Sequence, residues 1–316
     1  MKRDFLSIKD LTKDEIEFLI KRAIDLKVMT KKGVEYHSLK GKSLGMVFEK
    51  PSTRTRISFE VGMYQLGGYA VYLSPHDMQM GRGETIPDTA MVLSRYLDGV
   101  MIRTFSHKIV EEFAAHATIS VINGLTDLLH PCQILADMMT IVEQKGSMKG
   151  VKVAYVGDGN NVVNSWIEAA TIMDLELAVA CPRGYEPDKT ILKEALRRGT
   201  NHIVVSRDPF EVVKGADVLY TDVWVSMGQE EREEKEKRIF YNYQVNEKLL
   251  DAVGKEVAVM HCLPAHRGEE ITNEVFESRH SIVFDQAENR LHSQKALLEF
   301  LISGERDAKK RDAKST

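Results

Sequence analysis

The 316-residue sequence has few cysteines, little net charge and no long apolar run. Its three cysteines, Cys132, Cys181 and Cys262, form no Cys-x-x-Cys pair, which argues against a disulfide framework or a structural zinc site. A net charge of −4 gives no basic field for nucleic acid. No apolar run approaches the roughly 18 residues of a membrane span, and the first residues lack a signal-peptide pattern. We therefore expect a cytoplasmic protein.

Short apolar, β-branched segments alternate with longer helical patterns along most of the chain. The expected strands are Leu44–Phe48, Tyr69–Leu73, Gly99–Thr104, Ile119–Asn123, Val151–Val156, Glu176–Ala180, His202–Val205, Val218–Thr221, Val257–His261 and Ser281–Phe284. Expected helices include Val110–Ala117, Gln133–Glu143, Val162–Met173 and Asp188–Arg197. Such alternation predicts parallel sheets covered by helices on both faces.

A polar segment at 144–150 divides this alternation into two halves of similar length. The expected fold is α/β, with two doubly wound parallel-sheet domains at 1–146 and 147–304, joined by interdomain helices. A charged tail at 305–316 is expected to be frayed. Ligands of such proteins bind at the carboxyl ends of strands, so we expect a site in the crevice between the domains.

Three hydroxyl side chains and two arginines follow the first expected strand: Ser52, Thr53, Arg54, Thr55 and Arg56. Pro51-Ser52 is a reasonable helix entry, and the N-terminus of a helix attracts anions. The hydroxyls add donors, and Arg54 adds a fork suited to phosphate. Residues two apart on a helix point to nearly opposite sides, so Arg56 is expected to be an ion-pair partner instead. Alone, the segment fits either a phosphate site or a polar helix cap with solvated arginines.

Further polar residues fall where strands end or helices begin. Arg103 ends the apolar run that starts at Gly99, His130 and Gln133 open a helix, and Gln79 lies in a glycine-containing loop. Singly, each is explained by a solvated strand end or an ordinary turn. Because several fall at the expected carboxyl edge of one sheet, together they favour a ligand site.

Gly157 and Gly159 follow a strand in the second half of the chain and suggest a dinucleotide site. The third glycine of that fingerprint is replaced by Val162, which argues against a nicotinamide cofactor. Asn160 and Asn161 offer amides that could hold a carboxylate or an amine, or else cap the next helix.

Two more strand ends carry a carboxylate and a thiol. Asp222 follows one strand and would suit an ammonium group, and Cys262 follows another, where it is either a reactive thiol or an inert buried cysteine. The charged run 230–238 has oppositely charged pairs at i, i+4, which is typical of a solvated helix face.

Four motifs together resemble the aspartate/ornithine carbamoyltransferase family over nearly the whole chain. Ser52-Thr-Arg-Thr-Arg56 and His130-Pro-Cys-Gln133 resemble the signature for carbamoyl phosphate in that family. Asp222-Val-Trp-Val-Ser-Met-Gly228 and His261-Cys-Leu-Pro264 are similar to the ornithine branch.

The resemblance implies a homotrimer, sometimes assembled further, with a final helix that returns to the first domain. It implies a carbamoyl-phosphate site formed by Ser52, Thr53, Arg54, Thr55, Arg103, His130, Gln133 and Gln79, with Gln79 reaching a neighbouring subunit. Around the carbamoyl group this site would include Cys262, Leu263 and Arg290. Ornithine would be held by Asn161, Asp222, Ser226 and Met227.

The implied reaction is transfer of the carbamoyl group to the δ-amine of ornithine, which yields citrulline and phosphate in arginine metabolism. Arg103, His130 and Cys262 are the expected catalytic residues. We expect no metal or organic cofactor, because the leaving group is already activated. Putrescine as the acceptor, a nicotinamide-dependent dehydrogenase and a non-catalytic binding protein are the alternatives.

Overall fold

The computed structural model describes residues 2–74, 83–198, 202–224 and 233–303, and it divides into two compact units. The first unit is formed by the described parts of Met1–Leu6, Asp14–Thr126 and Arg290–Thr316, and the second by Ser7–Lys13 and Asp127–Asn289. The tail at 305–316 lies outside the described residues. The boundary predicted between residues 146 and 147 stays a prediction.

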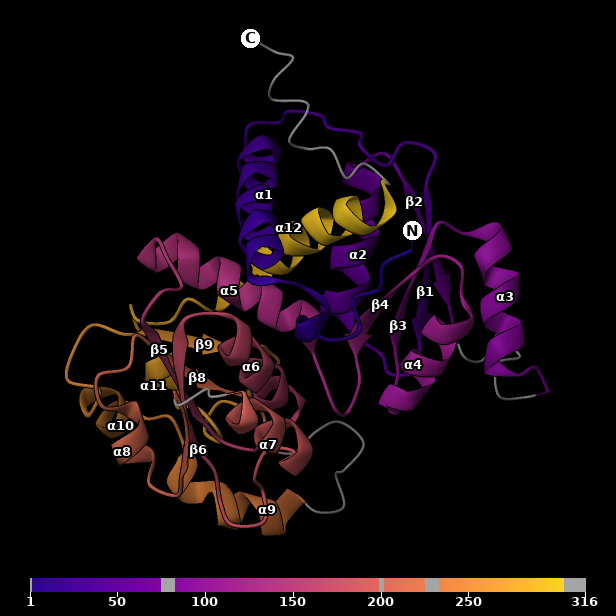
Figure 1. Ribbon diagram of the computed structural model, residues 1–316. Coiled ribbons are helices and arrows are strands. Elements are labelled where there is room, and N and C mark those ends of the chain that lie inside the picture. The colour runs from indigo at the N-terminus through magenta and orange to yellow at the C-terminus, as the bar shows by residue number, and fades with distance from the viewer. Residues whose placement is uncertain (1, 75–82, 199–201, 225–232, 304–316) are drawn as a thin grey trace. The chain divides into compact units, whose positions relative to one another are not determined.

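The first unit is built on a parallel sheet of four strands in the order β2-β1-β3-β4 (Figure 1). Its strands and the neighbouring helices are β1 (Ser43–Phe48), β2 (Tyr69–Leu73), β3 (Gly99–Arg103), β4 (Ser120–Leu125), α1 (Lys13–Lys31), α2 (Thr53–Gln65), α3 (Ile86–Tyr96) and α4 (His107–His116). Because β2 and β3 flank β1, the strand order reverses between β1 and β3. That reversal is where a doubly wound sheet opens a crevice for ligands.

The second unit is built on a parallel sheet of five strands in the order β7-β6-β5-β8-β9. Its strands are β5 (Val151–Val156), β6 (Leu175–Ala180), β7 (Ile203–Ser206), β8 (Val218–Thr221) and β9 (Ala258–His261). Here the order reverses between β5 and β8.

Helices of the second unit are α5 (Pro131–Lys145), α6 (Asn161–Ile172), α7 (Lys189–Arg197), α8 (Pro209–Val213), α9 (Glu233–Phe240), α10 (Glu247–Asp251) and α11 (Asn273–Phe276), with 3₁₀ turns η1 (Ile8–Asp10) and η3 (Tyr241–Tyr243). The final helix α12 (Val283–Ile302) contributes to both units, since the division falls between Asn289 and Arg290. No helix in the described ranges is long and apolar enough to cross a membrane.

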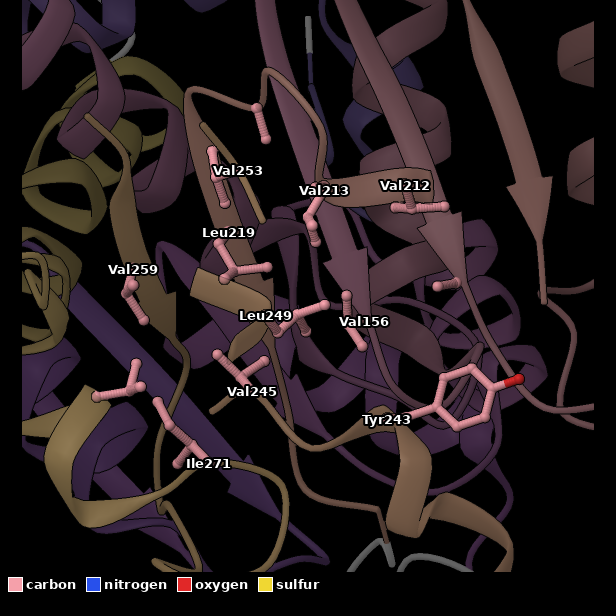
Figure 2. Close-up of a cluster of buried hydrophobic side chains, with 14 of the residues drawn as sticks. Val156, Val212, Val213, Leu219, Tyr243, Val245, Leu249, Val253, Val259 and Ile271 are labelled. Atoms are coloured by element: carbon pink, nitrogen blue, oxygen red, sulfur yellow. The ribbon is translucent and has the colours of Figure 1, made fainter. Parts of the chain in front are cut away.

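Apolar side chains on the strands bury each sheet against its helices. In the second unit, Val156, Leu219 and Val259 from β5, β8 and β9 belong to one cluster with Val212 and Val213 of α8 (Figure 2). Strands buried in this way are rich in valine, leucine and isoleucine along their whole length, which is typical of parallel sheets. These cores fix the strand ends from which the polar side chains project.

The parallel α/β architecture predicted from the sequence is confirmed, and the expected strands are observed within a residue or two, with one exception. The strand predicted at Ser281–Phe284 is wrong. Ser281 forms only an isolated bridge with Val259, and α12 begins at Val283. A short apolar run at the start of a helix has the same composition as a buried strand, so its pattern does not separate the two.

Candidate functional site

The N-terminus of α2 lies directly after β1, at the carboxyl edge of the first sheet. Ser52 caps the helix: its Oγ accepts a hydrogen bond from Thr55 N at 3.3 Å. Thr53 and Arg54 are the first two helical residues, the former exposed and the latter half-buried. The helix entry predicted at Pro51-Ser52 is therefore confirmed.

Two guanidinium groups converge on the hydroxyl of Thr55. Arg103 at the end of β3 donates from Nη1 to Thr55 Oγ1 at 3.4 Å, and Arg290 on α12 donates from Nη2 at 3.3 Å. Ser52 Oγ donates to the same oxygen at 3.1 Å. Thr55 is 1% exposed, Arg103 4% and Arg290 3%. We call Ser52, Thr55, Arg103 and Arg290 the arginine cluster. It is a set of donors, buried except for the half-buried Ser52, at the point where the first sheet reverses its strand order.

Gln294 supports the arginine cluster from behind. With its amide oriented to satisfy both neighbours, its oxygen accepts from Arg290 Nε at 3.0 Å and Nη2 at 2.9 Å, and its nitrogen donates to Ser58 Oγ at 2.5 Å. Ser58 in turn donates to the backbone oxygen of Arg54 at 2.6 Å. Sequence reasoning missed Gln294, although its position four residues after Arg290 on one helix was a signal that both side chains share a face.

Arg56 is separate from this cluster, as predicted from helix geometry. It is exposed, donates from Nε to Glu60 Oε2 at 3.2 Å, and lies over the ring of Tyr72 at 4.2 Å from the centroid. The expected ion-pair role of Arg56 is confirmed.

A second cluster lies at the carboxyl edge of the five-stranded sheet. Asp222, which follows β8 and is 6% exposed, accepts on Oδ1 from Cys262 Sγ at 2.9 Å and from Val223 N at 2.8 Å. Its Oδ2 accepts from Asn160 Nδ2 at 2.7 Å. We call Asn160, Asp222 and Cys262 the aspartate cluster. Its three residues follow β5, β8 and β9, which are neighbours in the sheet.

Of the two adjacent asparagines, Asn160 is the helix cap. Its Oδ1 accepts from Val162 N at 2.9 Å and from Val163 N at 3.4 Å. Asn161, the predicted ligand of ornithine, is the first residue of α6 and half-buried. Helix capping and binding of a ligand carboxylate or amine were the alternatives for these two amides; capping is observed for Asn160, whose Nδ2 contacts Asp222 of the protein itself, and the ligand role of Asn161 stays a prediction.

Backbone conformation and close packing explain why glycine occupies positions 157 and 159 of the same loop. Gly157 has a φ of 145°, which favours glycine. A Cβ on Gly159 would lie 2.4 Å from the backbone nitrogen of Pro187. These glycines therefore serve the turn and a close backbone approach, without a dinucleotide fingerprint.

The segment after β9 is held by a buried histidine–glutamate pair. Leu263 N donates to His261 Nδ1 at 2.8 Å, so the ring proton lies on Nε2, which donates to Glu270 Oε1 at 2.9 Å. Leu263 has a φ of 59°, a conformation that costs energy for a branched side chain. The pair thus fixes the backbone that positions Cys262 and Leu263.

His130 and Gln133, predicted together, both lie at the start of α5. His130 is its N-cap, and its backbone nitrogen donates to Ser165 Oγ at 2.8 Å. Gln133 Nε2 donates to Asp137 Oδ1 at 2.8 Å. Asp137 also accepts from Tyr220 on Oδ2 at 2.9 Å, and burial, followed by the charge of Asp137, raises the pKa of that phenol well above its usual value. The network fixes α5 on β8.

Gln79, Ser226 and Met227 lie outside the described residues. Among those described, two groups bring metal-ligand atoms within 4.8 Å of one another: one is Asp222, His261 and Cys262, and the other is His266, Glu269 and Glu270. The first group is already internally hydrogen-bonded: His261 uses both ring nitrogens, and Cys262 contacts Asp222. We assign no metal to either.

The protein is of the α/β class, with two parallel-sheet units that each carry polar side chains at the carboxyl ends of adjacent strands. Residues 3–143 match the model of the aspartate/ornithine carbamoyltransferase carbamoyl-phosphate-binding domain. Residues 149–301 match the model of the aspartate- or ornithine-binding domain of the same enzymes.

Full-length relatives agree with these matches. The chain is 59% identical to an ornithine carbamoyltransferase of Syntrophus aciditrophicus, over 96% of this chain and 100% of the relative. It is 54% identical to the enzyme of Pelobacter propionicus, at 96% and 100% coverage. The solved ornithine carbamoyltransferase of Pyrococcus furiosus superposes with a TM-score of 0.92 at 52% identity, over 96% of this chain and 97% of that one. The chain belongs to the aspartate/ornithine carbamoyltransferase family.

Proposed function

We propose that this protein transfers the carbamoyl group of carbamoyl phosphate to the δ-amine of L-ornithine, giving L-citrulline and phosphate. The observation that carries the proposal is the difference in charge between the two clusters. Buried guanidinium groups surround a hydroxyl in the unit that matches carbamoyl-phosphate-binding domains. A buried carboxylate stands in the unit that matches amino-acid-binding domains.

On the phosphate side, the N-terminus of α2 supplies backbone N–H groups and the helix dipole. Ser52, Thr53 and Thr55 add hydroxyls, and half-buried Arg54 adds a planar fork for two phosphate oxygens. These donors neutralise the phosphate and stabilise it further as it leaves with the bonding electrons of the C–O bond.

The carbonyl oxygen gains negative charge as the amine attacks. Arg103, His130 and Thr55 are the proposed donors to that oxygen. Within the first unit, the 3.4 Å contact between Arg103 and Thr55 orients both groups before the substrate binds. Gln133, Leu263 and Arg290 are proposed to complete the contacts with the carbamoyl group, and Gln79 those with the phosphate.

On the ornithine side, Asp222 is proposed to bind the α-ammonium group. Asn161, with Ser226 and Met227, would hold the rest of the amino-acid head. The δ-ammonium resembles lysine, with a pKa of about 10.4, so the neutral amine must be selected or generated at the opposite end of the substrate. Cys262 is proposed either to accept the proton that the δ-ammonium group loses or to orient the δ-amine. The departing phosphate is the alternative proton acceptor.

The proposal extends to the setting of the enzyme. We propose a homotrimer that acts in the cytoplasm in arginine biosynthesis, with Gln79 of one subunit serving the site of its neighbour. Light scattering coupled to gel filtration measures the assembly directly, and a monomer would contradict this part of the proposal.

A citrulline assay with carbamoyl phosphate tests the reaction. L-Ornithine should give citrulline, whereas putrescine and N-acetylornithine should react at least about 100-fold more slowly, because each lacks charges that the acceptor site pairs. Faster turnover of putrescine would move the proposal to a polyamine substrate. Absence of any carbamoylated product would refute the transferase.

A further inference from the structure

The aspartate cluster contains a residue that no substrate role requires. Asn160 lies one position before the predicted ornithine ligand Asn161, at the N-cap of α6. Its Oδ1 accepts two backbone N–H groups, at 2.9 and 3.4 Å. Because a carboxamide has one oxygen and one nitrogen, the cap determines that an N–H₂ group faces Asp222.

That N–H₂ group meets Asp222 Oδ2 at 2.7 Å, while Cys262 and Val223 donate to Oδ1. A carboxylate has about four acceptor positions, and these described donors use three of them. The carboxylate is therefore held in one rotamer, with capacity on Oδ2 for one further donor.

We infer that Asn160 is a positioning residue: it holds Asp222 in the orientation that binds the ammonium group of the amino-acid substrate. Through Asp222, it also sets the position of the Cys262 thiol. The inference rests on the proposed function for the identity of that substrate. It assigns Asn160 two tasks, one for each atom of its amide: the oxygen starts the helix, and the nitrogen fixes the carboxylate.

Substitutions can separate these tasks, because serine and aspartate are as good at the N-cap as asparagine. Asn160→Ser keeps a capping oxygen on a shorter side chain and removes the amide N–H₂ group that donates to Asp222. Asn160→Asp keeps the cap and places a second carboxylate against Asp222. Asn246→Asp is the matched control, since Asn246 caps α10 with its Oδ1, 3.1 Å from Leu249 N, and belongs to no cluster.

Steady-state kinetics are measured for the full-length variants in both substrates. We expect the KM for ornithine to rise about tenfold in Asn160→Ser and further in Asn160→Asp. The KM for carbamoyl phosphate should stay near the value of the wild type in both variants. The thermal midpoint should do the same in Asn160→Ser, whereas Asn160→Asp should lower it because a second carboxylate would adjoin that of buried Asp222. Asn246→Asp should change neither KM. An unchanged KM for ornithine in both Asn160 variants, or equal losses for both substrates, would overturn the inference.

A second measurement does not depend on turnover. The rate of iodoacetamide alkylation of Cys262, followed by peptide mass spectrometry at pH 8, should fall roughly threefold or more in Asn160→Asp, because added negative charge disfavours the thiolate. An alkylation rate equal to that of Asn246→Asp would count against the link. If the wild type forms no citrulline, the proposed reaction fails, whereas this measurement still tests the electrostatic link between residue 160 and Cys262.

Discussion

The carboxyl edges of the two sheets carry buried groups of opposite charge. At the first edge, two guanidinium groups and a hydroxyl converge on the neutral oxygen of Thr55. At the second edge, an amide, a thiol and a backbone N–H converge on the carboxylate of Asp222. The first arrangement gathers donors and favours an arriving anion, whereas the second has fixed its anion and leaves room for one cationic donor.

In both clusters an uncharged amide holds the charged group. Gln294 accepts two hydrogen bonds from Arg290, and Asn160 donates one to Asp222. A neutral partner orients a charge without neutralising it. An ion pair, such as the one between Arg56 and Glu60, would neutralise that charge.

The largest expected effect breaks the anion side. Arg54→Ala should lower kcat/KM for carbamoyl phosphate roughly 100- to 1,000-fold, because the proposed charged donor to the leaving group is lost. Since Arg54 is half-buried, the thermal midpoint should change little. Arg56→Ala is the matched control, expected within about twofold of the wild type because Arg56 pairs with Glu60 instead. Near-normal turnover of Arg54→Ala would contradict a phosphate role.

The next largest effect is expected from a substitution in the aspartate cluster. Asp222→Asn keeps the shape of the side chain and removes its charge, so the KM for ornithine should rise roughly 10- to 100-fold. Binding of carbamoyl phosphate, measured by calorimetry, should persist. Asp217→Asn is the control, since Asp217 lies just before β8 at the opposite end of the same strand and accepts from Lys152 N. Loss of carbamoyl-phosphate binding in Asp222→Asn alone would show that the two sides are not independent.

Much of this comparison could be predicted from the sequence, because buried parallel strands leave a readable pattern. Polar residues that directly follow apolar runs, such as Arg103, Asp222 and Cys262, lie at sheet edges as expected. The start of α2 at Ser52 and the separation of Arg56 followed from capping preference and helix geometry.

The supporting amides could not be predicted, because their roles depend on tertiary contacts. Asn160 and Asn161 have the same side chain, and only the course of the chain decides which caps α6 and faces Asp222. The supporting role of Gln294 depends on the packing of α12 against Ser58 of α2. The false strand at Ser281–Phe284 has a different, local origin: an apolar run at the start of a helix has the composition of a buried strand.

A smaller effect sharpens the comparison between the two supporting amides. Gln294→Met should raise the KM for carbamoyl phosphate about 3- to 10-fold, because Arg290 loses the neutral oxygen that accepts from its Nε and Nη2. The KM for ornithine should not change, in contrast to Asn160→Ser. Gln244→Met is the control: Gln244 also forms side-chain hydrogen bonds, as the donor to Gly268 O and Glu269 O, but in the second unit. Equal kinetic losses in both glutamine variants would indicate a general packing defect.

The smallest expected effect concerns charges buried on the helices behind the clusters. On α6, burial raises the pKa of Glu168, against the opposing effect of Lys9. On α12, Lys295 is 4% exposed and donates to Thr30 Oγ1 and Gln65 Oε1, both at 2.8 Å. Burial, aided by the nearby charge of Arg22, lowers the pKa of Lys295 from 10.5 to about 8.

The sign of each contribution follows from proton binding. For Glu168 the folded pKa is raised, so its contribution to stability is greatest below the ordinary value of 4.5 and falls as the pH rises through the folded pKa. For Lys295 the folded state binds fewer protons than the unfolded state between about pH 8 and 10.5, so its contribution rises with pH across that window. Lys295→Met should lack this rise. Subtracting the thermal midpoint of the variant from that of the wild type at pH 7, 8.5 and 10 cancels the other titrations. The difference should increase with pH, and a constant or falling difference would show that Lys295 is not held as a desolvated cation.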